Sequence, residues 1–239
     1  MTEEEWLHEV EDAFPREMLD ALAQQFPPRP ATNKNKRKRE RKLRLFGCAA
    51  CRHIEHLFIL EETRHLLEII ERHADGLASG AQLGAALRAS RHDRPPQPPT
   101  GEPWTPIYGA YDYACRAADS LGSANYVRFA EFFLEEIYGA SVNDPANPEE
   151  EHVYQKALLL DIFGNPFRAV AFDPAWRTDT AIALARQMYD SREFGAMPIL
   201  ADALQDAGCE DEQVLNHCRD ATAPHVRGCW VCDLVLSLG

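Results

Sequence analysis

The 239-residue chain contains no apolar run that approaches the roughly 20 residues a helix needs to cross a bilayer. The opening sequence, MTEEEWLHEVED, is acidic and lacks the charged and then apolar pattern of a secretory leader, so we expect none. Sustained alternation of apolar and polar residues, which is typical of strands, is missing too. These absences argue against a membrane protein and predict a cytoplasmic chain without a sheet.

The sequence also lacks the common catalytic motifs. It has no glycine-rich phosphate loop, no Gly-x-Ser-x-Gly, no His-Glu-x-x-His, and no strand–loop–helix context that would support one. A cysteine nucleophile would have no local signature, because its base would have to come from elsewhere in the fold. We therefore assign no catalytic residue and favour a protein that is not an enzyme.

Helical periodicity is present along almost the whole chain. Between Leu43 and Leu57, small and apolar residues recur at helical spacing and form one continuous face. Similar patterns predict helices over 3–14, 15–26, 61–74, 81–91, 107–121, 124–138, 149–163, 178–189, 198–207, 211–218 and 226–238. The predicted fold class is all-α, either an irregular multi-helix bundle or a short solenoid-like stack of helices.

A proline-rich segment divides the chain. Residues 93–106, DRPPQPPTGEPWTP, contain six prolines and predict a stiff, extended loop. We expect an N-terminal helical region over 1–92 and a C-terminal helical region over 107–239. The alternative is that the two regions form one continuous domain.

Charge is unevenly distributed. The net charge is −13, yet the segment 34–44 carries eight basic residues and one acid, so this segment is +7 and the remainder is −20. Its basic residues are Lys34, Lys36, Arg37, Lys38, Arg39, Arg41, Lys42 and Arg44. An acidic body repels nucleic acid, so phosphate or an acidic partner would have to bind at this segment. The alternative is a solvated loop and first helical turn, because no recognisable nucleic-acid module follows it.

Seven cysteines, an odd number, favour a reducing compartment with free or metal-bound thiols in place of disulfides. Two Cys-x-x-Cys pairs stand out, Cys48 with Cys51 and Cys229 with Cys232, and His225 precedes the second pair. Thiolates and imidazoles in such spacings are typical ligands of tetrahedral zinc. Zinc is therefore the cofactor that the sequence suggests.

Two ligand sets are compatible with this spacing. If 226–238 forms a helix that extends back to His225, then His225 and Cys232 lie roughly 10 Å apart along its axis, too far to bind one ion. Cys48 and Cys51 would then combine either with His225 and Cys229 or with Cys229 and Cys232. Both cysteine pairs also lie in stretches predicted to be buried helix, where cysteine is an ordinary small apolar residue, so core packing is the alternative to metal binding.

Several motifs together resemble a large, duplicated and uncharacterised family of planctomycete bacterial proteins. They are MTEEEWL at 1–7, RKLRLFGCAACR at 41–52, DIFGNPFR at 161–168, DPAW at 173–176, PILADALQDAGC at 198–209 and HCRDATAPHVRGCW at 217–230. The resemblance implies no activity. It implies that Cys48, Cys51, His225 and Cys229 belong to a shared pattern and that Cys232 departs from it, which favours the first of the two ligand sets.

The preferred function is a non-catalytic helical interaction or scaffold protein that acts through a protein partner. Aromatic residues at the end of the proline-rich loop and after it form either a core between two helices or a groove for a partner helix. They are Trp104, Tyr108, Tyr111, Tyr113, Tyr126, Phe129, Phe132, Phe133 and Tyr138. The alternatives are a nucleic-acid-associated accessory protein that uses 34–44, and a zinc-stabilised helical domain or metal enzyme.

Overall fold

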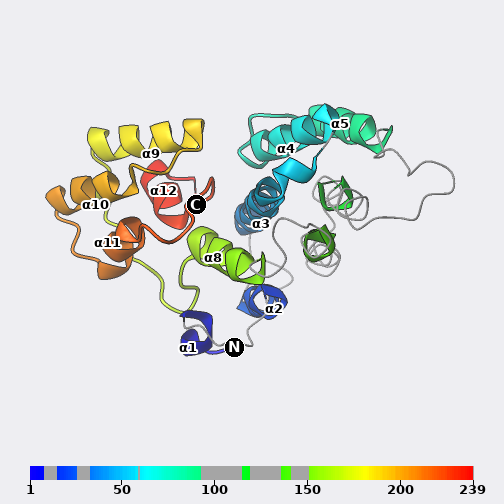
Figure 1. Ribbon diagram of the computed structural model, residues 1–239. Helices are drawn as coiled ribbons and strands as arrows, with labels where there is room; N and C mark the ends of the chain where they lie inside the picture. Colours follow the sequence, from blue (N-terminus) through cyan, green and yellow to red (C-terminus); the bar gives the residue numbers. More distant parts are fainter. Residues whose placement is uncertain are drawn as a thin grey trace. The chain divides into compact units, whose positions relative to one another are not determined.

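The computed structural model describes residues 1–7, 15–25, 33–58, 60–92, 115–118, 136–140 and 151–238 (Figure 1). Every regular element in these ranges is a helix, which confirms the all-α prediction. The elements are α1 (Glu3–Leu7), α2 (Pro15–Gln25), α3 (Asn33–His53), η1 (Glu55–Leu57), α4 (Glu61–Ala74), α5 (Gly80–His92), α8 (Glu151–Phe163), η2 (Pro174–Trp176), α9 (Asp179–Ser191), α10 (Met197–Asp206), α11 (Glu212–Arg219) and α12 (Trp230–Leu236). None of these helices has both the length and the hydrophobicity needed to cross a membrane.

The chain divides into two compact units. Residues 1–13 and 156–239 form the first, which we call the C-terminal unit, and residues 14–155 form the second, the central unit. The predicted loop at 93–106 lies outside the described residues, so a division there stays a prediction.

In the central unit, α4 packs against both α3 and α5. The apolar face predicted on α3 is buried there, with Phe46 and Ala50 fully inaccessible to solvent. A partly buried ion pair joins α3 to α4, where Arg52 Nε lies 2.6 Å from Glu71 Oε1. The packing of α3 on α4 thus combines an apolar stripe with a charge-assisted hydrogen bond.

In the C-terminal unit, α9 packs against α10 and α12, and α11 packs against α10 and α12. Side-chain caps begin two of these helices: Thr178 accepts from the backbone of Ala181, and Asp211 accepts from those of Gln213 and Val214. Gly208 ends α10 with φ +88°, as its position in the sequence predicts. Apolar side chains from all four helices form one core.

The turn after α8 holds α1, from the start of the chain, to the rest of the C-terminal unit. Helix α8 ends at Phe163, and Gly164 follows with φ +64°. The buried Trp6 of α1 donates from its indole Nε1–H to the Gly164 carbonyl at 2.9 Å, and its ring meets Phe167 edge-on. Helix α1 is therefore anchored to the turn that ends α8.

Replacing Gly164 by alanine is expected to destabilise the C-terminal unit by about 2 kcal/mol. The left-handed conformation costs a non-glycine residue roughly 1–2 kcal/mol, and overpacking adds to that cost. An added Cβ would lie 3.1 Å from the Trp230 ring. Urea unfolding measures the loss. Gly195→Ala is the matched control, because a Cβ there meets nothing within 4 Å, and equal losses in the two variants would contradict this account.

Candidate metal centre

Four side chains of the C-terminal unit, those of Asp161, His217, His225 and Cys229, converge on one point. Each offers one ligand atom, and these four atoms all lie within 4.8 Å of one another. Among the described residues, no other group of three or more histidine, cysteine or acidic side chains converges in this way. The four come from α8, from α11, from the loop between α11 and α12, and from the N-cap of α12.

Asp161 lies at the centre of the group. Its side chain is only 1% exposed, and its Oδ1 lies 2.9 Å from His225 Nδ1 and 3.1 Å from His217 Nε2. Its second oxygen, Oδ2, accepts a hydrogen bond from the backbone N–H of Val226 at 3.0 Å. A buried carboxylate needs such partners, since desolvation of an unpaired charge is costly. One oxygen is therefore fixed by backbone while the other faces both imidazoles.

His217 presents one nitrogen to two neighbours. Its Nε2 lies 3.2 Å from Cys229 Sγ and 3.1 Å from Asp161 Oδ1. In a catalytic triad the nucleophile and the acid engage different nitrogens of the imidazole. Here sulfur, carboxylate oxygen and both imidazoles turn toward a shared point, which is the arrangement of ligands around a cation.

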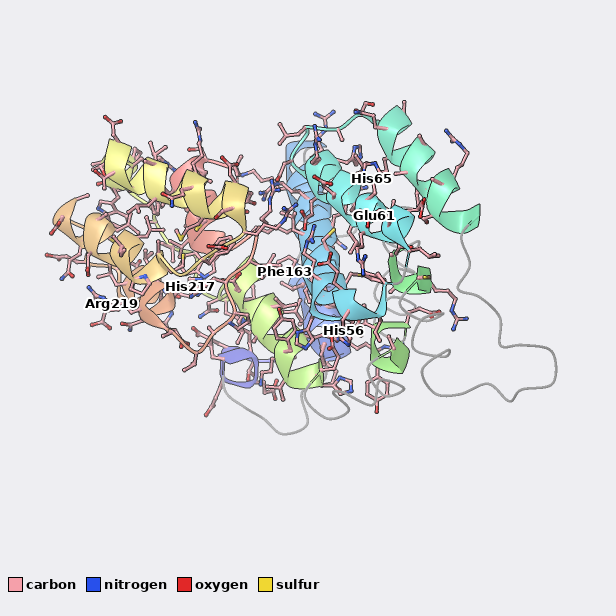
Figure 2. All side chains as sticks on the ribbon, turned by 45° about the horizontal axis from the view of Figure 1, so that its top comes forward. His56, Glu61, His65, Phe163, His217 and Arg219 are labelled. Carbon is pink, nitrogen blue, oxygen red and sulfur yellow. The ribbon has the colours of Figure 1, made fainter. Side chains whose placement is uncertain are left out.

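Figure 2 labels His217 together with Arg219, two residues further along α11. Arg219 Nη2 donates to Gln205 Oε1 on α10 at 2.6 Å. The two residues thus serve different sides of α11: Arg219 ties the helix to α10, while His217 contributes to the cluster.

The loop between α11 and α12 brings His225 and Cys229 to the site. The Asp220 carboxylate accepts from the backbone of Thr222 at 2.9 Å and forms a local turn. The Asp220 carbonyl lies 3.3 Å from His225 Nε2. When Nε2–H donates to this carbonyl, the lone pair of Nδ1 is left to face Asp161, which is how outer-shell partners commonly orient a ligand histidine.

Helix α12 starts later than the sequence pattern predicts. The sequence pattern predicts a helix over 226–238, but α12 begins only at Trp230, with Cys229 as its N-cap. Gly228 adopts φ +100°, and the Cys229 N–H bonds to the Val226 carbonyl at 2.9 Å in a turn. The prediction of a helix over 226–238 that extends back to His225 is therefore wrong at its start, and a turn brings His225 and Cys229 together instead.

The protonation of the group follows from this geometry. Burial alone would lower the histidine pKa values, but Cys229 and Asp161 outweigh it and raise the pKa of His217 to about 9 and that of His225 to about 10. Burial opposes ionisation of Asp161, yet hydrogen bonds from the two histidines hold its pKa below the usual value. Burial raises the pKa of the Cys229 thiol well above its usual range. A cation entering the site would displace these protons.

The residues predicted as zinc ligands fall into two groups. His225 and Cys229 lie in the cluster. Cys48 and Cys51 lie on α3 in the central unit, where both are buried, and burial raises the pKa of Cys51 well above its usual value. Glu151, Arg52 and Cys115 also act on the Cys51 thiol, so burial does not by itself decide between core packing and metal binding, and the combined set of four stays a prediction. Cys232, the ligand of the second set, is buried with its sulfur 3.7 Å from that of Met197.

The basic segment 34–44 lies within α3 rather than in a loop. Arg41 is 8% exposed, and its Nε pairs with Asp75 Oδ1 at 2.9 Å, so it is not available to a phosphate. Arg37 is exposed, and the side chains of Lys34 and Lys36 lie outside the described residues. Nucleic-acid binding by this segment stays a prediction.

Sequence reasoning missed Asp161 and His217. The signal for Asp161 is its place in the run LLLDIF, because an acid inside an apolar helical segment must find a partner when it is buried. His217 lies only 12 positions before Cys229, but its contact with Asp161 joins residues 56 positions apart and cannot be predicted from spacing. Comparison of the chain with protein-family models, curated proteins and solved structures found no match, and the resemblance to planctomycete proteins stays a prediction.

Proposed function

We propose that the C-terminal unit is a zinc-binding helical domain whose ion is held by Asp161, His217, His225 and Cys229. The observation that carries the proposal is the convergence of four ligand atoms within 4.8 Å of one another. With bonds of roughly 2.0–2.3 Å, the ligand atoms of tetrahedral zinc lie about 3.3–3.8 Å apart. The contacts of 2.9 to 3.2 Å at His217 and His225 are close to that spacing.

The donor chemistry favours Zn²⁺ over other ions. One thiolate and two imidazoles suit zinc, whereas Mg²⁺ and Ca²⁺ prefer sites built from oxygen alone. Ionised Cys229 and Asp161 together carry two negative charges, which match the charge of the ion. The occupied site is therefore neutral, as its burial requires, since Asp161 is 1% and Cys229 is 0% exposed.

The role we propose for the ion is structural. Its ligands come from the last turn of α8, the last turn of α11, the following loop and the start of α12, so the ion links segments up to 68 positions apart in the chain. Four protein ligands complete a tetrahedral shell, as in structural zinc sites. The domain would thus be held in shape by zinc, and binding to a protein partner remains the role expected for the chain as a whole.

The test is the metal content of the full chain, expressed without an affinity tag and purified under reducing conditions. We expect about one equivalent of zinc per chain by elemental analysis, as four protein ligands for one ion require. Cobalt in its place should give a sulfur-to-cobalt charge-transfer band and intense tetrahedral d–d bands. A chain that holds less than about a tenth of an equivalent, and takes up none on titration, would exclude the proposal.

Two variants locate the ion. Asp161→Asn keeps the shape of the side chain but removes its charge, so zinc should be lost or bound far more weakly. The double variant Cys48→Ala/Cys51→Ala should keep its full equivalent, because the four side chains of the cluster already complete a tetrahedral shell. The opposite pattern would instead support the ligand set predicted from the sequence.

A further inference from the structure

A pocket with a volume of about 510 Å³ lies beside the cluster within the C-terminal unit. Two of the four proposed ligands, Asp161 and His217, line it, whereas His225 and Cys229 do not. His217 is the more accessible of the two histidines, with 14% of its side chain exposed against 7% for His225. A bound ion would therefore face the pocket on the side where Asp161 and His217 bind it, which we call the Asp161–His217 edge.

The pocket has an apolar wall and a polar rim. Leu160 and Trp230 belong to the wall, and the Trp230 ring centre lies 5.2 Å from that of His217. At the rim, Asn165 Nδ2 donates to Glu3 Oε1 at 2.7 Å, and Arg168 Nε lies 3.3 Å from the same oxygen. This rim already binds one carboxylate, that of Glu3 in α1.

We infer that this pocket admits a small carboxylate-type anion that reaches the bound metal ion at its Asp161–His217 edge; the inference rests on the proposed function. Zinc accepts a fifth ligand in sites where solvent or substrate reaches it. An oxygen anion suits that position, because it would take over from Glu3 the nitrogen donors of Asn165 and Arg168, which line the same pocket as the metal ligands. The site would then be a ligand-binding metal centre in addition to a structural one.

The experiment uses the full chain loaded with one equivalent of Co²⁺ and titrates it with acetohydroxamate, a small bidentate oxygen anion. Five-coordinate cobalt absorbs less than tetrahedral cobalt, so the d–d bands should weaken saturably, by roughly two-fold, when the ion gains a ligand. Cobalt retained after desalting should stay at one per chain. Two outcomes would overturn the inference: bands that stay unchanged while cobalt remains bound, and removal of cobalt by the probe. Neither outcome would contradict the proposed function.

Variants test the route of entry. Ala157→Phe places a ring in the pocket, and it should weaken the response to the probe by roughly ten-fold or more without loss of cobalt. Val153→Phe is the matched control on α8: Val153 is 66% exposed and does not line the pocket, so its response should equal that of the unaltered chain. If Ala157→Phe fails to fold, Ala223→Phe fills the same pocket from the loop. An undiminished response in the pocket variant would overturn the inference, whereas failure of the unaltered chain to bind cobalt would overturn the proposed function itself.

Discussion

Removal of zinc is expected to lower the melting temperature of the C-terminal unit by on the order of 20 °C. A ligand present at 1,000 times its Kd stabilises the folded state by about 4 kcal/mol. For a domain of this size, each kcal/mol shifts the melting temperature by roughly 4–8 °C. The ion should contribute at least that much, because its ligands come from α8, α11, the loop that follows and α12.

The metal-free unit should not be fully unfolded. Without the ion, Cys229 keeps its proton, and the Asp161 carboxylate raises the pKa of both histidines against the effect of burial, which favours protons on the nitrogens that face it. The bridging protons partly compensate the buried Asp161 carboxylate, and the apolar core of α9 to α12 stays in place. We therefore expect a folded but weakened domain, in contrast to small zinc fingers that unfold outright when the metal is removed.

The measurement compares two isomers of one compound. 1,10-Phenanthroline chelates zinc and 1,7-phenanthroline does not, so only the first should lower the melting temperature in calorimetry. Added zinc should restore the original transition. If elemental analysis shows that the metal has gone while the transition stays in place, the ion does not stabilise this domain.

The fold class was predictable because helical periodicity is a local property. The Leu43–Leu57 pattern predicts an amphipathic helix, and α3 buries that face up to its end at His53, whereas Ile54 and Leu57 are buried in the following turn and η1. Helix ends were predictable where glycine takes a left-handed conformation, as at Gly164 and Gly208. The left-handed conformation of Gly228 was not predicted, because the residues around it continue an apolar pattern. The last helix was therefore predicted to start too early.

The candidate site was only half predictable. His225 and Cys229 lie near each other in the sequence, and their spacing indicates metal chemistry without any knowledge of the fold. Asp161 comes 56 positions before His217, so their meeting depends on where the fold places the end of α8. Spacing alone carries no information about that contact. Cys48 and Cys51 also have the spacing of metal ligands, and both are buried on α3, where their role as ligands stays a prediction.

Replacing Cys229 by alanine is expected to abolish stoichiometric zinc binding. Cys229 supplies the one sulfur of the cluster, and its loss leaves two imidazoles and one carboxylate. Loss of an outer-shell partner already costs roughly 10–100-fold in metal affinity, and loss of a direct ligand should cost more. In the cobalt-loaded protein, the sulfur-to-cobalt charge-transfer band should disappear, which identifies the missing ligand by its chemistry rather than by stability.

Cys232→Ala is the matched control, because Cys232 lies three residues away on α12 and is equally buried, at 0% exposure. Its sulfur packs against Met197 and also interacts with the Cys229 side chain, but Cys232 is not one of the four proposed ligands. Its removal should therefore cost about 1 kcal/mol through a small cavity and leave one equivalent of zinc with an unchanged charge-transfer band. The pair of variants separates ligation from packing, since both remove a buried sulfur from the same segment. Metal loss in both would favour a site that uses the second Cys-x-x-Cys as a whole. Metal retention in both would show that Cys229 is a core residue and that the four-residue site does not exist.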